Sequence, residues 1–307
     1  MPITVLRNIA QAHADIFHLV DDVLENCPVL DSIPFCESTD GLDHKYETLT
    51  AVEGGGLKKQ DAEPAKATAV SDLGMLTLGI LAFTVEVGVD TLRRMYGTSD
   101  PQSGLAKYIA QRLPKFVRHN SMAFERQLMD LLVKYAVASG NAINAGGSGE
   151  GYAILATRWV EDEFCGLYNP AGFAQSGFFV ARPRYAGGVY VSGGKEVVGM
   201  DYYCDIDVLL NNKHCIGAIC NIDSTHKPTA AQIDEIALMA RAGQDGRSLL
   251  IMHPKAGVMV RDIKGSLLHM TPADQNVNRS VRAWDVMPIV ETYNFGDDGG
   301  LISNQTI

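Results

Sequence analysis

The chain has 307 residues, of which 46% are hydrophobic and 20% charged, which is ordinary for a soluble globular protein of one elaborate domain or two. The chain has 26 Lys and Arg and 36 Asp and Glu, which give a net charge of −10. This acidic balance argues against a protein that binds nucleic acid through its phosphates, because such binding needs clustered cations. The six cysteines form no C-x-x-C pair and are few for the chain length, so we expect a reducing cytoplasm and no disulfide framework. The sequence shows no signal-peptide pattern. It also lacks an apolar run of about 18 residues, so we expect no membrane span.

Residues 4–27 are predicted to form an amphipathic helix that Pro28 ends. A short apolar segment bracketed by prolines, VLDSIPF, follows it. Neither piece has much core of its own, so we expect this N-terminal arm to pack on another part of the fold or on another subunit. The alternative is an ordinary first helix of a compact domain. The apolar stripe of the helix consists of Ile9, Ile16, Val20, Val23 and Leu24.

Residues 40–90 are predicted to form a long hairpin. HKYETLT is the outgoing strand, three glycines at 54–56 open a polar tip, and the return strand alternates apolar and polar residues from Phe83 to Val89. The length of this excursion suggests an arm that reaches over a neighbour, although a polar tip of this kind is often a surface loop.

Residues 103–136 give the strongest helical pattern in the chain, with apolar residues at spacings of three, four or eight. Such a helix could approach about 50 Å in length. Pro114 lies inside it and is expected to kink or divide it. A helix of this length usually acts as the spine of its domain.

A glycine-rich break, GNAINAGGSGEG, separates this helix from a mixed region at 152–257. There WVEDEF is predicted to end a short helix, PTAAQIDEIALMARA to form a helix, and SLLIMHP to form a buried strand. Further strands are expected at FFVARP, GGVYVSGGKEVVG, YYCDIDVLL and CIGAICNID. The tail, from VMVRDIKG to YNFGDD, is predicted to add strands that return to the first region.

Two glycine motifs come close to catalytic or phosphate-binding signatures. GGSGEG places Ser148 almost in a nucleophile elbow, but Glu150 stands where the final glycine is required, so we interpret the segment as a linker. GGVYVSGGKE lacks the first glycine of a phosphate loop, and Glu196 follows Lys195 where a hydroxyl residue would bind magnesium. A strand–turn–strand hairpin is the better interpretation.

The other candidate groups also have ordinary explanations. Cys215 and Cys220 are five apart, so on one strand they would face opposite ways, and with His214 and His226 they match no known zinc spacing. We therefore predict buried small hydrophobes for the cysteines and no catalytic, cofactor or metal site. The remaining candidates are interpreted as a solvated edge at Asp201, Asp205 and Asp207, a solvated turn at Glu161, Asp162 and Glu163, and a strand end at His253.

The order of these segments resembles the HK97-like major capsid proteins of tailed bacteriophages. NCPVLDSIPF resembles the apolar arm of that family, HKYETLTAVEGGG with LKKQDAEPAK resembles the opening of its extended loop, and VEVGVDTLRRM resembles its strand-to-spine junction. MAFERQLMDLLVKYAVASGN resembles the end of the spine helix, with Gly140-Asn141 in place of Gly-Asp, and FCGLYN resembles a following Gly-Leu element. The resemblance covers most of residues 1–170, and residues 200–260 only by the order of helix and strand. Pro114 and the glycine-rich insertion depart from it.

The resemblance implies an α+β fold in four parts. These are an N-terminal arm at 1–38, an extended loop at 39–90, a peripheral domain at 91–152 and 258–307 that carries the spine helix, and an axial domain at 153–257. The loop cations Lys58 and Lys59 are expected to face acidic groups on a neighbour; a solvated loop tip is the alternative.

The same resemblance implies a structural protein, not an enzyme, that assembles as pentamers and hexamers into an icosahedral head in the host cytoplasm. The head would enclose double-stranded DNA without sequence-specific binding. Expected partners are further copies of the chain, a portal protein and a possible decoration protein, with no cofactor and no membrane. Because the chain starts almost directly at the arm, we also expect a separate scaffolding protein.

Two alternatives stay open. A cellular nanocompartment of the same fold would enclose cargo enzymes. A small-ligand sensor is suggested by GAICNIDSTHKPTAAQIDEIALMARA, which looks like the last strand and helix of a GAF domain.

Overall fold

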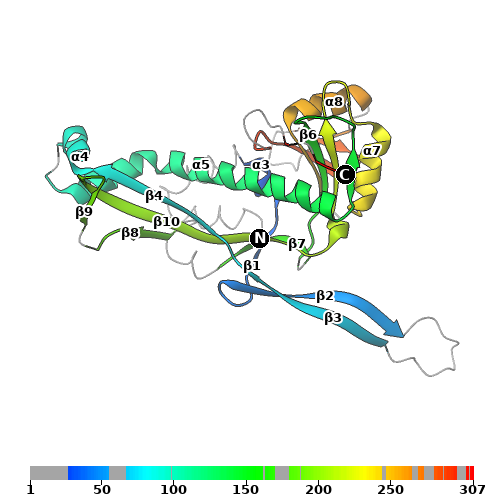
Figure 1. The fold of residues 1–307 in the computed structure, drawn as a ribbon, viewed down its shortest axis with the longest axis horizontal. Coiled ribbons are helices and arrows are strands. Elements are labelled where there is room, and N and C mark those ends of the chain that lie inside the picture. Colours follow the sequence, from blue (N-terminus) through cyan, green and yellow to red (C-terminus); the bar gives the residue numbers. More distant parts are fainter. Residues whose placement is uncertain are drawn as a thin grey trace.

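The computed structural model describes residues 27–54, 67–97, 99–161, 163–169, 180–186, 188–243, 247–264, 269–272, 280–285, 287–295, 302–303 and 305–307. One long helix, α5 (Pro101–Ala138), runs along the body, with a sheet beneath it and a second sheet at its C-terminal end (Figure 1). A two-stranded hairpin projects away from the body. No helix in the described ranges is long and apolar enough to cross a membrane.

Helix α5 has a well-defined start and end. The Asp100 carboxylate accepts hydrogen bonds from the amides of Gln102 and Ser103, at 3.2 and 3.0 Å, and caps the N-terminus. At the other end Gly140 adopts a left-handed φ of 73°. With 38 residues, the helix is about 57 Å long.

Pro114 does not divide α5, contrary to one of the two outcomes expected from the sequence. The helix continues through it because buried residues on both sides, Ile109 and Val117, pack on the sheet beneath. Tertiary packing can compensate for the backbone hydrogen bond that a proline removes.

The sheet beneath α5, called here the spine sheet, has the strand order β1 (Phe35–Glu37), β7 (Phe164–Tyr168), β10 (Lys195–Leu210), β4 (Ile80–Gly88). Two short strands, β8 (Val180–Pro183) and β9 (Val189–Ser192), also pair with β10. Helix α4 (Val89–Tyr96) and the first half of α5 cover one face, so every second residue of β4 is half-buried or buried.

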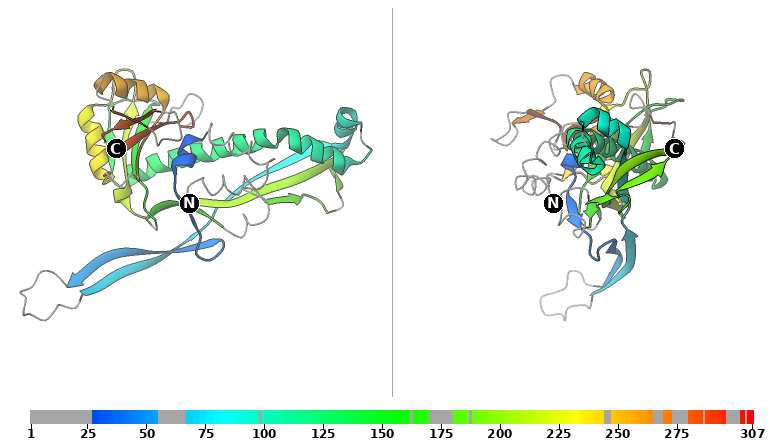
Figure 2. Two further views of the ribbon diagram at one scale, coloured as in Figure 1. Left: turned by 180° about the vertical axis from the view of Figure 1, so that it is seen from behind. Right: turned by 90° about the vertical axis from the view of Figure 1, so that its left-hand side faces the viewer.

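The second sheet, called here the C-terminal sheet, has the order β13 (His269–Pro272), β14 (Ser280–Trp284), β15 (Met287–Glu291), β12 (Ser248–Met252), β6 (Tyr152–Arg158), β11 (Ile216–Ile222), β5 (Ala142–Asn144). A short 3₁₀ turn, η1 (Lys213–Cys215), precedes β11. Helix α3 (Pro28–Ser32) and the second half of α5 cover one face, while α7 (Ala230–Met239) and α8 (Pro254–Lys264) cover the other (Figure 2). The result is a three-layer arrangement with two cores.

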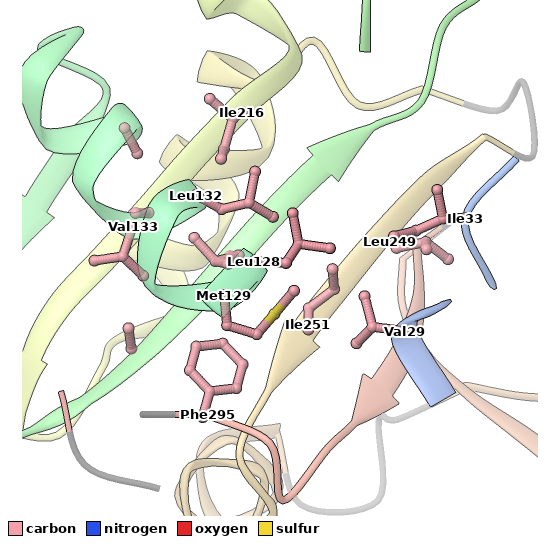
Figure 3. Close-up of a cluster of buried hydrophobic side chains, with 14 of the residues drawn as sticks. Val29, Ile33, Leu128, Met129, Leu132, Val133, Ile216, Leu249, Ile251 and Phe295 are labelled. Carbon is pink, nitrogen blue, oxygen red and sulfur yellow. The ribbon is translucent and has the colours of Figure 1, made fainter. Parts of the chain in front are cut away.

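The first of these cores joins parts of the chain that are far apart in sequence. Leu128, Met129, Leu132 and Val133 of α5 meet apolar residues of α3, β11, β12 and the segment after β15 (Figure 3). The residues that α5 meets there include Val29, Ile33, Ile216, Leu249, Ile251 and Phe295. The N-terminal and C-terminal segments are therefore fixed on the same stretch of the long helix.

The projecting hairpin consists of β2 (Asp43–Gly54) and β3 (Ala67–Thr77). Leu78 and Gly79 then separate β3 from β4, so the predicted return strand at 83–89 is a separate strand of the spine sheet, paired with β10. The predicted extended loop at 39–90 therefore contains both a projecting part and a part built into the body.

Strand pairing also groups the rest of the chain differently from the predicted peripheral domain at 91–152 and 258–307 and axial domain at 153–257. Strands β7 and β10, expected in the axial domain, belong to the spine sheet. Strands β13 to β15, expected to return to the spine helix, extend the C-terminal sheet through β12. The chain passes from the spine sheet to the C-terminal sheet after β4, returns at β7 and passes to the C-terminal sheet again at β11. Local patterns carry no signal for such crossings.

Two local predictions were also wrong. The segment before WVEDEF is strand β6, which is buried on both faces and so lacks the alternation that distinguishes a strand from a helix. VMVRDIKG belongs to helix α8, where Ala256 and Val260 stand one turn apart in the core. The helix at PTAAQIDEIALMARA is confirmed as α7, with a capping box between Thr229 and Gln232.

We expect Gly217→Ala to lower the free energy of unfolding by about 1–3 kcal/mol. A Cβ atom at Gly217 on β11 would lie 2.4 Å from the carbonyl oxygen of Ile236, so α7 would have to move off the sheet. Gly149→Ala is the matched control, because a Cβ atom there meets nothing within 4 Å. Urea unfolding measures both variants; equal midpoints would show that α7 can shift without cost.

Candidate functional site

The residues considered as zinc ligands do not come together. His214 and Cys215 precede β11 and His226 follows it, so the seven-residue strand of about 23 Å separates them. In the described part of the chain, no three His, Cys, Asp or Glu side chains are placed to hold a metal ion. The structure thus offers no metal centre among the residues it describes.

Cys215 and Cys220 lie in the same hydrophobic core, which corrects the expectation that they face opposite ways. Cys215 belongs to the 3₁₀ turn and not to the strand, so strand alternation does not apply to the pair. Burial raises the pKa of both thiols to about 12, which makes them unreactive at neutral pH.

The three aspartates of β10 are hydrogen-bonded to other segments of the chain, so they are more than the solvated edge that the sequence predicted. Asp201 accepts from Thr84 of β4 at 2.7 Å and pairs with Arg184 at 3.2 Å. Asp205 accepts from Asn169 at 3.0 Å, and Asp207 accepts from the Gly79 amide at 3.0 Å. Each carboxylate fastens a neighbouring segment to the spine sheet.

The glycine motifs are connections, as predicted. GGSGEG joins β5 to β6, and Gly193 and Gly194 form the turn between β9 and β10 with φ values of 56° and 75°. Positive φ at both central residues is the geometry of a tight hairpin turn, so glycine suits it. His253 lies at the end of β12, also as predicted.

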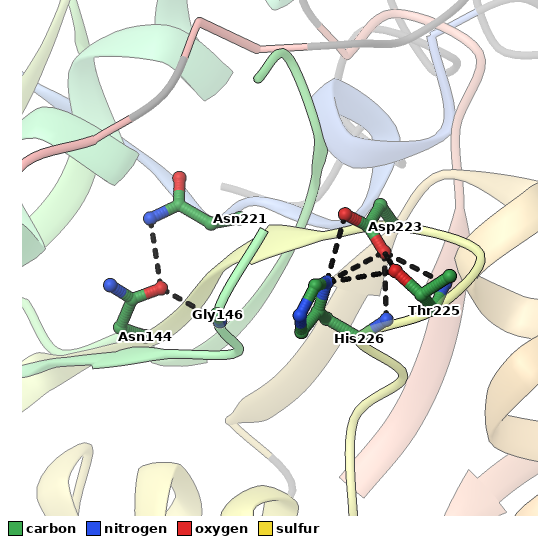
Figure 4. Close-up of polar contacts among 6 residues, drawn as sticks. All are labelled: Asn144, Gly146, Asn221, Asp223, Thr225 and His226. Atoms are coloured by element: carbon green, nitrogen blue, oxygen red, sulfur yellow. Dashed lines mark hydrogen bonds and ion pairs between the residues drawn. The ribbon is translucent and has the colours of Figure 1, made fainter. Parts of the chain in front are cut away.

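A compact polar cluster lies at the end of β11 (Figure 4). The Asp223 carboxylate accepts from the Thr225 hydroxyl at 2.7 Å and from the His226 amide at 2.7 Å, and the His226 ring nitrogen Nδ1 lies 3.0 Å from both its oxygens. The hydrogen bond from Thr225, together with those from His226, holds the pKa of Asp223 well below its usual range. Beside it Asn221, at a φ of 59°, donates to Asn144 at 3.0 Å. These bonds close a turn.

The β2–β3 hairpin is the most unusual surface of the chain. On one of its faces Leu73 and Met75 are 84% and 61% exposed, opposite the exposed side chains of Glu47 and Lys45. On the other face the Tyr46 ring lies across Gly74, where a Cβ atom would come within 2.4 Å of it. An isolated two-stranded hairpin is marginal in water, so an apolar face without a covering layer suggests a contact with another molecule.

The root of the hairpin is firmly attached. Leu78 is buried and donates its amide to the carbonyl of Leu42 at 2.8 Å, and it packs with Cys165, Leu167 and Leu209 of the spine sheet. The Thr77 hydroxyl donates to Asp43 at 2.7 Å. The direction of the hairpin is therefore set at its base.

Glu125 of α5 is fully buried and connects three separate parts of the chain. One of its oxygens accepts from the amides of Val29 and Leu30, each at 3.1 Å, and the other accepts from Thr292 at 2.5 Å and Asn294 at 3.0 Å. Burial raises the pKa of this carboxyl group against the opposing effect of its four donors. Glu125 therefore ties the N-terminal segment and the C-terminal segment to the spine helix.

Sequence patterns did not single out Glu125. The one signal in the sequence is that this glutamate lies among the apolar residues of MAFERQLMDLL. Glutamates on the exposed face of an amphipathic helix have the same kind of neighbours, so the signal does not identify a buried one. The loop cations Lys58 and Lys59 and the amphipathic helix at 4–27 lie outside the described residues.

Comparisons with known proteins complete this description. No family model matches the chain, and no curated protein matches its sequence. Among solved structures, a chain of bacteriophage epsilon15 covers 89% of this chain and 86% of its own length, with a TM-score of 0.52 and 14% identity. A chain of the bacteriophage JBD30 capsid covers 85% of this chain and 88% of its own, with a TM-score of 0.52 and 12% identity. The chain has the HK97-like capsid fold.

The HK97-like fold expected from the order of segments is therefore confirmed. At this level of identity the likeness concerns the fold alone. The stretch that suggested a sensory domain, residues 217–242, forms β11 and α7 of the C-terminal sheet layer.

We expect Glu125→Ala to lower the free energy of unfolding by about 3 kcal/mol or more, because it leaves buried donors without an acceptor. Asp130→Ala is the matched control on the same helix, where the partly exposed pair with Lys134 is worth less than about 1 kcal/mol. Urea unfolding gives both values, and amide exchange at Val29 and Leu30 tests whether the loss is local. Similar losses in the two variants would contradict the role of Glu125.

Glu125 also predicts a pH dependence. Because its pKa is raised on folding, folding favours the protonated form. That contribution is present below the unfolded pKa of about 4.3 and is lost as pH rises through the raised value. The stability of the native chain relative to Glu125→Gln should therefore improve as the pH falls across the acidic range toward about pH 4. Denaturant unfolding across this range measures the difference; a constant value would contradict the shift.

Proposed function

We propose that this chain is the major capsid subunit of a tailed bacteriophage, a structural protein without catalytic activity. Copies would assemble through pentamers and hexamers into an icosahedral shell that encloses double-stranded DNA. The HK97-like fold supports this proposal, and the observation that carries it is the projecting β2–β3 hairpin with its exposed Leu73 and Met75.

The hairpin suits a role in contacts between subunits. Among the described residues, its packing on the body lies at its root, through Leu42, Leu78 and the spine sheet, and its outer strands extend away from the body of its own subunit. In a closed shell each subunit has many neighbours, so modest apolar contacts add up to a stable particle. Pentamers and hexamers need slightly different contacts, which a hairpin fixed at one end can supply while both sheets keep their packing.

The partners follow from this proposal. A portal protein, a separate scaffolding protein and a possible decoration protein would act beside further copies of the chain, with assembly in the host cytoplasm and the shell as part of the virion. A net charge of −10 suits a wall that encloses DNA without adhering to it.

The first experiment is to express the full chain alone, and together with any scaffolding protein encoded beside it. Light scattering gives the particle mass, and negative-stain imaging gives the shape. Closed shells, or free pentamers and hexamers, are the expected result, and their nucleic-acid or enzyme content separates a virus head from a nanocompartment. A monomer or dimer in both preparations would contradict the proposal.

In a preparation that forms shells, we expect Leu73→Asp to abolish closed particles while the subunit stays folded. An 84% exposed side chain contributes little to the stability of its own subunit, so the free energy of unfolding should change by less than about 0.5 kcal/mol. Leu73→Met is the matched control, because it keeps an apolar side chain of similar size and should assemble. Particle yield by sedimentation measures both; normal shells from Leu73→Asp would exclude this face from subunit contacts.

A further inference from the structure

Helix α5 buries different sides in its two halves. In its first half, Leu105 and Ile109 pack on the spine sheet. In its second half, Met129, Val133 and Ala136 pack on the C-terminal sheet. Successive residues of an α-helix are about 100° apart, so the side that is core in the second half continues into the first half as the side facing away from the spine sheet.

That side of the first half is basic. Lys107, Lys115 and Arg118 lie on it within about 80° of one another and along about 17 Å of the helix, and all three are exposed. No Asp or Glu occurs between residues 101 and 124. Among the described residues, no ion pair engages any of the three cations. These three side chains are called here the basic face.

Helix α4 adds positive charge at the same end of the molecule, where it lies beside the start of α5 (Figure 1). Arg93 and Arg94 are both exposed. The two acidic residues of this region are already engaged, since Asp90 lies 3.6 Å from Arg93 and Asp100 caps α5. Residues 89–124 contain six Lys and Arg and two Asp, a net charge of +4 in a chain whose total is −10.

Most acidic side chains of β4 and β10 lie on the other face of the spine sheet. Tyr202, Cys204 and Ile206 of β10 face the helices, so the residues between them point away. The carboxylates on that far side are Glu86, Asp201, Asp205 and Asp207. Glu196, the remaining carboxylate of β10, directly follows the cation Lys195. The sheet therefore separates the basic face from the carboxylates that could neutralise it.

We propose that the basic face binds the phosphate backbone of duplex nucleic acid without reading its sequence. Cations fixed on a helix neutralise phosphates and release the counterions condensed on them, which supplies the free energy of sequence-independent binding. Duplex DNA carries about one negative charge per 1.7 Å, so a face about 17 Å long meets several phosphates. The choice of partner rests on the proposed function, since a head that encloses DNA brings its wall against a duplex.

The acidity of the chain limits this contact but does not oppose it. Outside residues 89–124 the chain carries a net charge of −14, which repels a polyanion over most of its surface. Three cations on one helix face give a weak contact that salt weakens further. The wall can then touch the enclosed DNA reversibly along one face while the rest of it does not adhere.

The first test measures the salt dependence of DNA binding. Fluorescence anisotropy follows a labelled duplex of about 30 base pairs with the full chain between about 50 and 200 mM salt. The variant replaces the basic face by glutamine, a good helix former, as Lys107→Gln, Lys115→Gln and Arg118→Gln. The slope of log affinity against log salt should become shallower by about 2.7, because each lost phosphate contact removes about 0.9.

A matched control removes the same three charges elsewhere. Lys213, Lys227 and Arg241 are exposed and lie before β11, after β11 and after α7, so their replacement by glutamine leaves α5 unchanged. The control should keep the native slope, and a duplex of another sequence should bind the native chain equally well. Urea unfolding shows that each variant is folded. Equal slopes in the control and in the basic-face variant would overturn the proposal.

The second test maps the contact on the native chain, with no substitution. An N-hydroxysuccinimide ester modifies exposed lysine amines, and mass spectrometry reads the extent at each position. Duplex DNA should reduce modification of Lys107 and Lys115 and leave Lys213 and Lys227 unchanged. Polyglutamate at equal charge concentration is the comparison for an acidic protein partner. Equal protection by polyglutamate, or no protection by DNA, would overturn the assignment to nucleic acid.

Particle mass measured on the same preparations separates this inference from the proposed function. Closed shells from a chain whose Lys107 and Lys115 gain no protection from DNA would leave the proposed function intact and contradict the inference. A chain that DNA protects at both lysines but that forms neither shells nor pentamers and hexamers would retain the binding face and contradict the proposed function.

Discussion

The change of buried face along α5 is the constraint from which the rest of the structure follows. A straight helix of 38 residues cannot serve one compact core, so its first half covers the spine sheet and its second half completes the C-terminal sheet. The chain then has to cross between the two sheets that this helix joins. Two segments far apart in sequence, residues 29–30 and 292–294, are fixed to its second half, where Glu125 accepts four hydrogen bonds.

This arrangement separates rigid parts from a projecting one. Both faces of the C-terminal sheet are covered, and its central strands β6, β11 and β12 are almost fully buried. The β2–β3 hairpin lacks such cover on the face of Leu73 and Met75, but its root is fixed by Leu78 and by the bond from Gly79 to Asp207. Closely packed sheets resist gradual deformation. We therefore expect conformational differences between copies of the chain to occur mainly in the part of the hairpin beyond its root.

The sequence predicted the elements that carry their own periodicity. The long helix, the helix after Thr229, the turn at Gly193 and Gly194 and the hairpin excursion all follow from local spacing and turn chemistry. It failed where burial is uniform, as in β6, and where a helix is short and glycine-containing, as in α8. The grouping of strands into sheets is a different matter: β10 pairs with β4 more than a hundred residues away, and no local pattern encodes that partner.

The candidate chemical residues show why polar side chains can be concentrated without forming an active site. Asp201, Asp205 and Asp207 alternate along one face of β10, as a cation site would require, yet each is engaged by a different segment. Asp223 and His226 are adjacent, but their hydrogen bonds close the turn in which they lie. Carboxylates placed at joints between elements stabilise a particular arrangement of those elements, and in a chain built of two sheets and one shared helix such joints are numerous. Polar residues at conspicuous spacing are then explained by the architecture, before any chemistry is invoked.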